Sequence, residues 1–136
     1  MPERASTALF IGATAAQLFV SDITASCDFF TQKLGFSLVF VYGDPPFYAQ
    51  VRRDEGLLNL RHVDTPVIDP ERRDREELLA ADLAVDTAAH LKQLFLEFQA
   101  VGVGFFQTLR QEPWGAKTFI VKDPDGNLLL FSGPAA

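Results

Sequence analysis

A strand-turn-helix pattern that occurs twice constrains this chain more than any other feature of its sequence. The first copy has an apolar strand at 17–22 and a helical pattern at 24–36, and the second has a strand at 82–86 and a helical pattern at 87–98. After each turn apolar residues recur at steps of three to four, which is typical of a helix that packs on a sheet. The repeat predicts two similar halves in one fold.

Each copy continues into three further strands. In the first half we expect a helix capped by Thr24 and closed at Gly35, followed by strands at 36–42, 47–52 and 56–63. In the second half we expect a strand at 78–85 and a helix capped by Thr87 and closed at Gly102, followed by strands at 103–109, 117–122 and 127–132. The last two strands are joined by a turn at 123–126. The prediction is an α+β fold of two βαβββ modules that form a curved, cup-shaped mixed sheet.

Length and composition favour one domain. The chain has 136 residues and 48% hydrophobic content, enough for one substantial core. We expect a single domain over 1–136, with modules at about 14–63 and 78–133 and a charged linker at 64–77. Nearly every residue of 71–77 is ionised, which favours a solvated connector over a loop that gates a ligand.

Charge and cysteine content exclude several classes of function. A formal net charge of −6 argues against nucleic-acid binding, which normally requires a basic surface. The single cysteine, Cys27, cannot form an intramolecular disulfide, which is consistent with a reducing cytoplasm. No apolar run approaches the roughly 20 residues that span a bilayer. We therefore expect a cytoplasmic protein with neither a nucleic-acid nor a membrane partner.

Catalytic motifs are weak. The two histidines are His62, at the end of a predicted strand, and His90, on the second predicted helix. Cys27 lies in the first predicted helix with no obvious base nearby, which favours a structural thiol over a nucleophile. Acid-base catalysis by a lone carboxylate such as Glu112 stays open. The sequence predicts no catalytic residue.

Two motifs at a suitable separation carry a resemblance to a known family. The first combines residues 20–22 with Phe29, Phe30 and 34–36, and the second is Asp-Pro-Asp-Gly-Asn at 123–127, before the final strand. From about 14 to 131 the chain resembles the vicinal oxygen chelate superfamily, which includes glyoxalase I, extradiol dioxygenases, fosfomycin resistance enzymes and bleomycin resistance proteins.

The resemblance also implies where a metal-dependent member places its ligands. Carried onto this sequence, those positions are Ala15, Asn59, Ala80 and Leu130. Three of the four carry no donor atom, and one asparagine does not hold a divalent ion by itself. The resemblance therefore implies a protein with no metal site and no cofactor.

Within the superfamily the chain is most similar to the metal-free bleomycin resistance group. The similarity rests on Pro-Trp-Gly at 113–115, Phe119, the motif at 123–127 and Phe131, together with residues 44–47 and 51–54. The resemblance implies a homodimer whose subunits pair head to tail. It also implies a groove in which aromatic side chains from both subunits hold the ligand.

The candidate ligand-binding residues are aromatic and polar side chains that we expect near such a groove. Trp114, presented from a turn, either faces a ligand or packs against the partner subunit, and Phe47 has the same two alternatives. The other candidates are Phe40, Asn59, His62 and Phe119, for which surface, sheet or core positions are the alternatives.

We therefore predict a metal-free protein that sequesters an aromatic or antibiotic-like small molecule at a dimer interface. The alternative is a glyoxalase-like or dioxygenase-like enzyme with an atypical metal site built from His62, Asn59 and Glu112. A third possibility is an interaction module without a cavity. Arg52, Arg53 and Arg61 depart from the acidic character of drug-sequestering members, and they leave room for an anionic or neutral ligand.

Overall fold

The computed structural model describes residues 8–135 of the chain. Its first half forms one βαβββ module, made of β1 (Ala15–Val20), α1 (Ile23–Asp28) continued by the π-helical segment η1 (Phe29–Lys33), β2 (Ser37–Tyr42), β3 (Tyr48–Arg53) and β4 (Gly56–His62). The strands lie in the order β1-β4-β3-β2. β1 runs parallel to β4, and the other neighbours are antiparallel.

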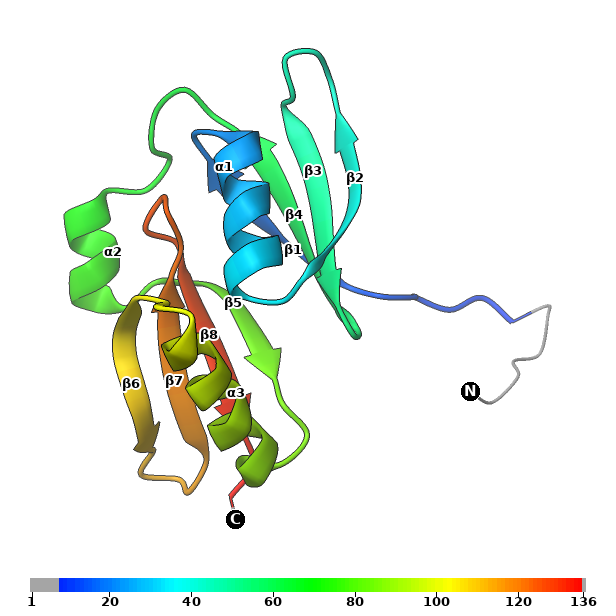
Figure 1. Cartoon of the computed structure of the whole chain (residues 1–136). Helices are drawn as coiled ribbons and strands as arrows, with labels where there is room; N and C mark the ends of the chain where they lie inside the picture. Colours follow the sequence, from blue (N-terminus) through cyan, green and yellow to red (C-terminus); the bar gives the residue numbers. More distant parts are fainter. Residues whose placement is uncertain (1–7, 136) are drawn as a thin grey trace.

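The second half repeats this arrangement. It comprises β5 (Leu79–Ala84), α3 (Ala88–Ala100), β6 (Phe105–Gln111), β7 (Lys117–Lys122) and β8 (Leu128–Gly133), in the sheet order β5-β8-β7-β6. The predicted α+β fold of two βαβββ modules is therefore confirmed, with two separate four-stranded sheets. In Figure 1 one sheet lies above the other, and α1 and α3 both lie in front of their sheets. Within the described residues no helix is both long and apolar enough to cross a bilayer.

The first helix begins differently from the prediction. Asp22, not Thr24, is its N-cap, and the Asp22 carboxylate accepts a hydrogen bond of 3.0 Å from the Ala25 amide. The helix starts early because Ile23 is buried in the core, which leaves Thr24 inside the first turn. The predicted cap of the second helix is confirmed, since Thr87 accepts from the amide of His90 at 3.0 Å.

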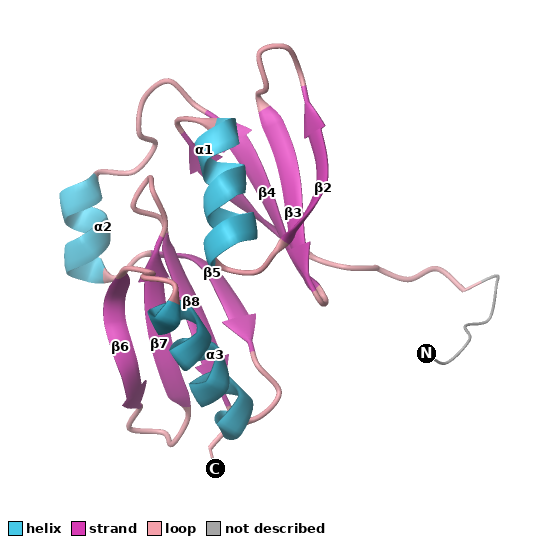
Figure 2. Cartoon of the chain, viewed as in Figure 1, coloured by secondary structure: helices cyan, strands magenta, loops and turns pink. Residues whose placement is uncertain are grey.

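The linker also differs from the prediction, because part of it is the helix α2 (Pro70–Glu76), seen at the left of Figure 2. Asp69 caps this helix, Pro70 occupies its first turn, and Arg72 pairs with Glu76 one turn later at 2.6 Å. Arg73 is buried, so this segment is not fully solvated. The charge pattern concealed the helix, since its stability comes from caps and ion pairs and not from an apolar stripe.

One core joins the two modules. The face of each sheet that meets its helix is apolar, and the buried residues of both halves form one continuous cluster. At its centre Phe119 is fully buried, and its ring centroid lies 5.1–5.9 Å from those of Phe95, Phe98, Phe105 and Phe131. Phe119, a candidate ligand residue, therefore packs the core and presents no surface to a ligand.

The predicted turn between β7 and β8 ties the second module to the first. Asp123 accepts hydrogen bonds from the amides of Asp125 (2.9 Å) and Asn127 (2.7 Å), which fixes the turn. Asp125 then accepts from the Ser21 amide at 3.0 Å, and the Asn127 side chain donates to the Phe19 carbonyl at 3.1 Å. The turn therefore positions the end of β1 as well as its own hairpin.

The buried turn carboxylate predicts a pH dependence of stability. Desolvation outweighs the hydrogen bonds from Asn127 and Asp125 and raises the pKa of Asp123 from 3.8 to about 6. Because the folded pKa lies above the unfolded value, this contribution to stability is complete below the unfolded pKa and is lost as the pH rises through the folded pKa. Asp123→Asn does not titrate. Relative to wild type, its free energy of unfolding should rise by up to about 3 kcal/mol between acidic and neutral pH in urea titrations. A stability difference that does not change with pH would contradict this assignment.

The aromatic core predicts that Phe119→Ala lowers the free energy of unfolding by about 3–5 kcal/mol, because it leaves a cavity among four rings. Phe40→Ala is the matched control, since Phe40 is 39% exposed and its loss should cost much less. Chemical denaturation of both variants checks the prediction. Equal losses would show that Phe119 is not a core residue.

Candidate functional site

Alternation along the strands leaves one face of the first sheet uncovered. Leu18, Val51 and Leu58 point toward the core, so their neighbours along each strand point to the other side. The cross-strand register groups these neighbours into one surface. We call it the N-terminal open face, and it consists of Gln17, Phe19, Phe40, Tyr42, Tyr48, Gln50, Arg52, Asn59 and Arg61.

One row of the N-terminal open face is aromatic with a single cation. Tyr42 lies opposite Tyr48, Tyr48 opposite Arg61, and Arg61 opposite Phe19. Phe40 adds a ring whose centroid is 5.7 Å from that of Tyr48. The exposed fractions of Phe19, Phe40 and Tyr42 are 37%, 39% and 65%, so the aromatic wall faces outward from the single chain.

The neighbouring row is amide-rich. Phe40, Gln50, Asn59 and Gln17 face one another across β2, β3, β4 and β1. The Gln50 side chain donates to the Asn59 side-chain oxygen at 2.8 Å. The Gln50 carbonyl and the Asn59 NH2 group remain to accept and donate at this surface. Asn59, one of the candidate ligand residues, therefore lies beside the aromatic wall.

The outer strand β2 is exposed on both faces. Besides Phe40 and Tyr42, the apolar side chains of Leu38, Val39 and Val41 are 43–49% exposed. A long apolar edge strand is a ready site for association with another chain. The composition and exposure of β2 make it a candidate association surface.

The face of the second sheet that points away from α3 has a different character, and we call it the C-terminal open face. Part of it is buried in the single chain, at Thr118, Ile120 and Leu128. It consists of Asp82, Ala84, Gln107, Arg110, Thr118, Ile120, Lys122, Leu128, Leu130 and Ser132. At its end the Thr118 hydroxyl accepts from Gln107 at 3.0 Å and donates to Glu112 at 2.8 Å. Arg110 donates to the same Glu112 oxygen at 2.8 Å. The hydrogen bonds from Arg110 and Thr118 lower the pKa of Glu112, so this carboxylate is ionised and has Arg110 as its cationic partner.

The two candidate aromatic residues on turns, Trp114 and Phe47, lie at opposite ends of the folded molecule. Trp114 is 74% exposed in the β6–β7 turn, at the lower end of Figure 1. Phe47 is 46% exposed in the β2–β3 turn at the upper end, where its ring packs edge-to-face against Tyr42 at 5.5 Å. A single chain therefore does not bring Trp114 together with Phe47 and Phe40.

The three residues of the alternative metal site have separate environments. The His62 ring nitrogens lie 2.9 Å from the Ser21 carbonyl and 2.9 Å from the Asp64 carboxylate. Asn59 bonds within the first sheet, and Glu112 bonds within the second module. Across residues 8–135 no group of three His, Cys, Asp or Glu side chains is placed to hold a metal ion.

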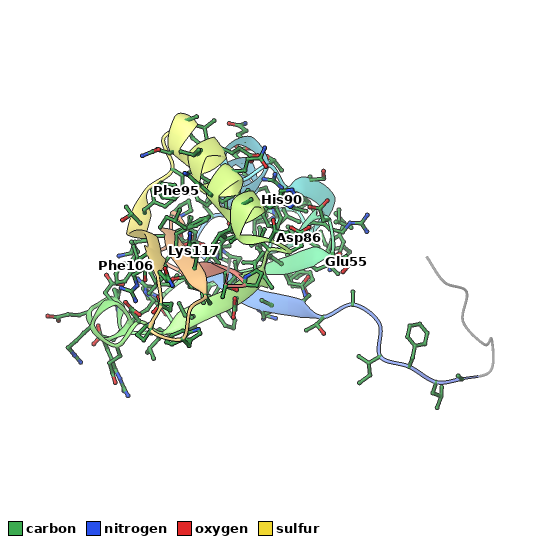
Figure 3. The ribbon with its side chains drawn as sticks, turned by 90° about the horizontal axis from the view of Figure 1, so that it is seen from below. Glu55, Asp86, His90, Phe95, Phe106 and Lys117 are labelled. Atoms are coloured by element: carbon green, nitrogen blue, oxygen red, sulfur yellow. The ribbon has the colours of Figure 1, made fainter. Side chains whose placement is uncertain are left out.

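A wide groove of about 1360 Å³ runs along the seam between the modules. It is lined by the β3–β4 turn, β5 and α3, and none of the six candidate residues lines it. Figure 3 shows Glu55, Asp86 and His90 on this side of the molecule, with Phe106 and Lys117 on the opposite side. His90 and Asp86 pair at 2.7 Å, which lowers the pKa of Asp86. The histidine that lines the groove is therefore paired with a carboxylate that lies just before the start of α3.

Several residues of the N-terminal open face are absent from the sequence-based candidates. Each lies two residues from another member of the face along its strand, and they are Gln17, Phe19, Tyr42, Tyr48, Gln50, Arg52 and Arg61. The alternation of polar or aromatic residues with buried Leu, Val and Ala on β3 and β4 was the available signal.

Known structures share this fold. A glyoxalase/bleomycin resistance protein/dioxygenase from Alicyclobacillus acidocaldarius is 19% identical, with a TM-score of 0.73 over 90% of this chain and 91% of that one. The bleomycin resistance determinant encoded on transposon Tn5 is 17% identical, with a TM-score of 0.70 over 93% and 100% of the two chains. The bleomycin-binding protein of Streptomyces verticillus, solved with copper(II)-bleomycin, is 24% identical, with a TM-score of 0.66 over 95% and 99%.

Sequence comparison agrees at the level of the family. A search of curated proteins gives no significant match. The sequence profile of the Glyoxalase/Bleomycin resistance protein/Dioxygenase superfamily matches residues 11–131. This match spans both modules, so the chain belongs to the Glyoxalase/Bleomycin resistance protein/Dioxygenase superfamily.

Proposed function

We propose that this protein binds a small aromatic molecule reversibly, in a groove between the N-terminal open face of one copy and the C-terminal open face of a second copy. The observation that carries the proposal is the uncovered aromatic wall of Phe19, Phe40, Tyr42 and Tyr48. Aromatic side chains supply flat apolar area at little conformational cost, which suits a planar ligand. The binding involves no covalent step and takes place in the cytoplasm.

The proposed dimer is supported by what a single chain leaves exposed. β2 is apolar and accessible on both faces, and Trp114 stands on the far end of the other module. A head-to-tail pair places Trp114 of one copy near Phe40 and Phe47 of the other. Such pairing covers β2 and closes the aromatic wall into a groove.

The bleomycin-binding neighbour, solved with copper(II)-bleomycin, supports a small-molecule role for this architecture. An enzyme with a metal site made of His62, Asn59 and Glu112 is less well supported, because each of these side chains has its own partners in a different part of the fold. The geometry of the described residues favours binding.

The dimer is tested by sedimentation velocity at micromolar concentration. Wild type should sediment as a dimer, and Val41→Lys should shift it to a monomer, because a lysine on an edge strand keeps its ammonium in water and opposes pairing. Leu96→Lys is the matched control, since Leu96 is 50% exposed on α3, outside both open faces. A monomeric wild type, or dissociation of the dimer by both variants alike, would show that the proposed interface is wrong.

Ligand binding is tested with a panel of metal-chelating aromatic antibiotics. Trp114 is the single tryptophan, so its fluorescence should change when a ligand enters a groove that it borders. Phe40→Ala should weaken the best ligand by about 3- to 10-fold, the amount expected for one aromatic stacking contact. Leu96→Ala, at an exposed position on α3 outside both open faces, should leave the affinity unchanged. If neither fluorescence nor thermal stability responds to any compound, the sequestration proposal fails.

A further inference from the structure

We infer that the ligand is a planar aromatic acid whose anionic group is held by Arg61. The inference rests on the proposed function and names the chemical class that the same site takes.

The first support is the charge of the sheet. β1, β2, β3 and β4 contain no aspartate or glutamate, although the whole chain carries a net charge of −6. The permanently charged side chains of these strands are the arginines Arg52, Arg53 and Arg61. The N-terminal open face is therefore a positive surface on an acidic protein, which disfavours a cationic ligand.

The second support is that Arg61 lacks an anionic partner. Arg53 pairs with Glu97 at 2.7 Å, and Arg110 pairs with Glu112 at 2.8 Å. Over residues 8–135, by contrast, Arg61 forms no salt bridge and no side-chain hydrogen bond. Its guanidinium can meet a carboxylate with two parallel hydrogen bonds, which gives both strength and orientation.

The third support is the position of Arg61 in the aromatic row. Arg61 lies between Tyr48 and Phe19 across the sheet, with the Phe40 ring beside Tyr48. Directly opposite side chains have Cβ atoms about 5 Å apart. A fused ring system lying on Tyr48 and Phe40 therefore brings a substituent at its edge within reach of Arg61. The Asn59 and Gln50 amides in the next row are placed to meet polar atoms of the ring.

Two carboxylates at the facing surface already have cations of their own. Glu112 is matched by Arg110, and Asp74, beside the C-terminal open face, is matched by Lys122 at 2.7 Å. Asp82 accepts from the Ser132 hydroxyl at 3.1 Å but has no cation, so it is the carboxylate that could compete for Arg61. The experiment therefore measures assembly as well as affinity.

Isothermal titration with three probes of one shape tests the inference: naphthalene-2-carboxylate, naphthalene-2-carboxamide and 2-naphthylmethylammonium. Wild type should bind the carboxylate about 10-fold more tightly than the amide, as expected for a charge-assisted hydrogen bond, and the ammonium most weakly. Arg61→Gln should remove the preference for the carboxylate and keep the amide affinity. Arg61→Lys should retain part of the preference. Arg75→Gln, the control with the same charge change on exposed α2, should behave as wild type.

The outcomes separate the inference from the proposed function. If the amide or the ammonium binds as tightly as the carboxylate, the protein is an aromatic binder and the aromatic-acid inference is wrong. If none of the three probes binds, both the sequestration proposal and the inference fail. If Arg61→Gln dissociates the dimer in sedimentation while Arg75→Gln does not, Arg61 serves the interface and its assignment to the ligand is overturned.

Discussion

The structure depends on the pleat of its two sheets, which sends successive side chains to opposite faces, and on the presence of one covering helix for each sheet. The face beneath each helix is filled with leucine, valine and phenylalanine, and it forms the shared core. In the second sheet the opposite face is partly buried within the chain, at Thr118, Ile120 and Leu128. In the first sheet the opposite face is left uncovered. Its aromatic, amide and arginine side chains are therefore the surface from which a site can be built.

The two modules are held in register by features remote from that surface. The ring cluster around Phe119 joins sheet and helix in the second module, and the turn at 123–127 reaches the end of β1 through Asp125 and Asn127. The linker helix adds a bond between Lys122 and Asp74. These contacts fix the N-terminal open face indirectly, because they hold β1 and hence Phe19 in place. The residues that stabilise the fold are consequently different from those of the proposed ligand site.

Local signals predicted much of the fold. The cap at Thr87 and the turn at 123–126 depend on hydrogen bonds within a few residues, and Gly35 adopts the positive φ that closes a helix. The faces of strands were harder to assign. The run Thr118-Phe119-Ile120-Val121 is apolar on both sides, so it gives no alternation that would place Phe119 in the core. On β3 and β4 alternation was present, and it would have placed Tyr48 and Arg61 beside Asn59.

The sequence by itself determined the repeat, the number and order of strands in each module, and the absence of acidic residues from the first sheet. These properties follow from periodicity, turn chemistry and composition, which act over short distances along the chain. Only the tertiary structure decided which side chains share a face, that Arg61 stands among rings without an anion, and that Trp114 lies far from Phe40. Those relations depend on strand register and on the packing of one module against the other, which bring together residues distant in sequence.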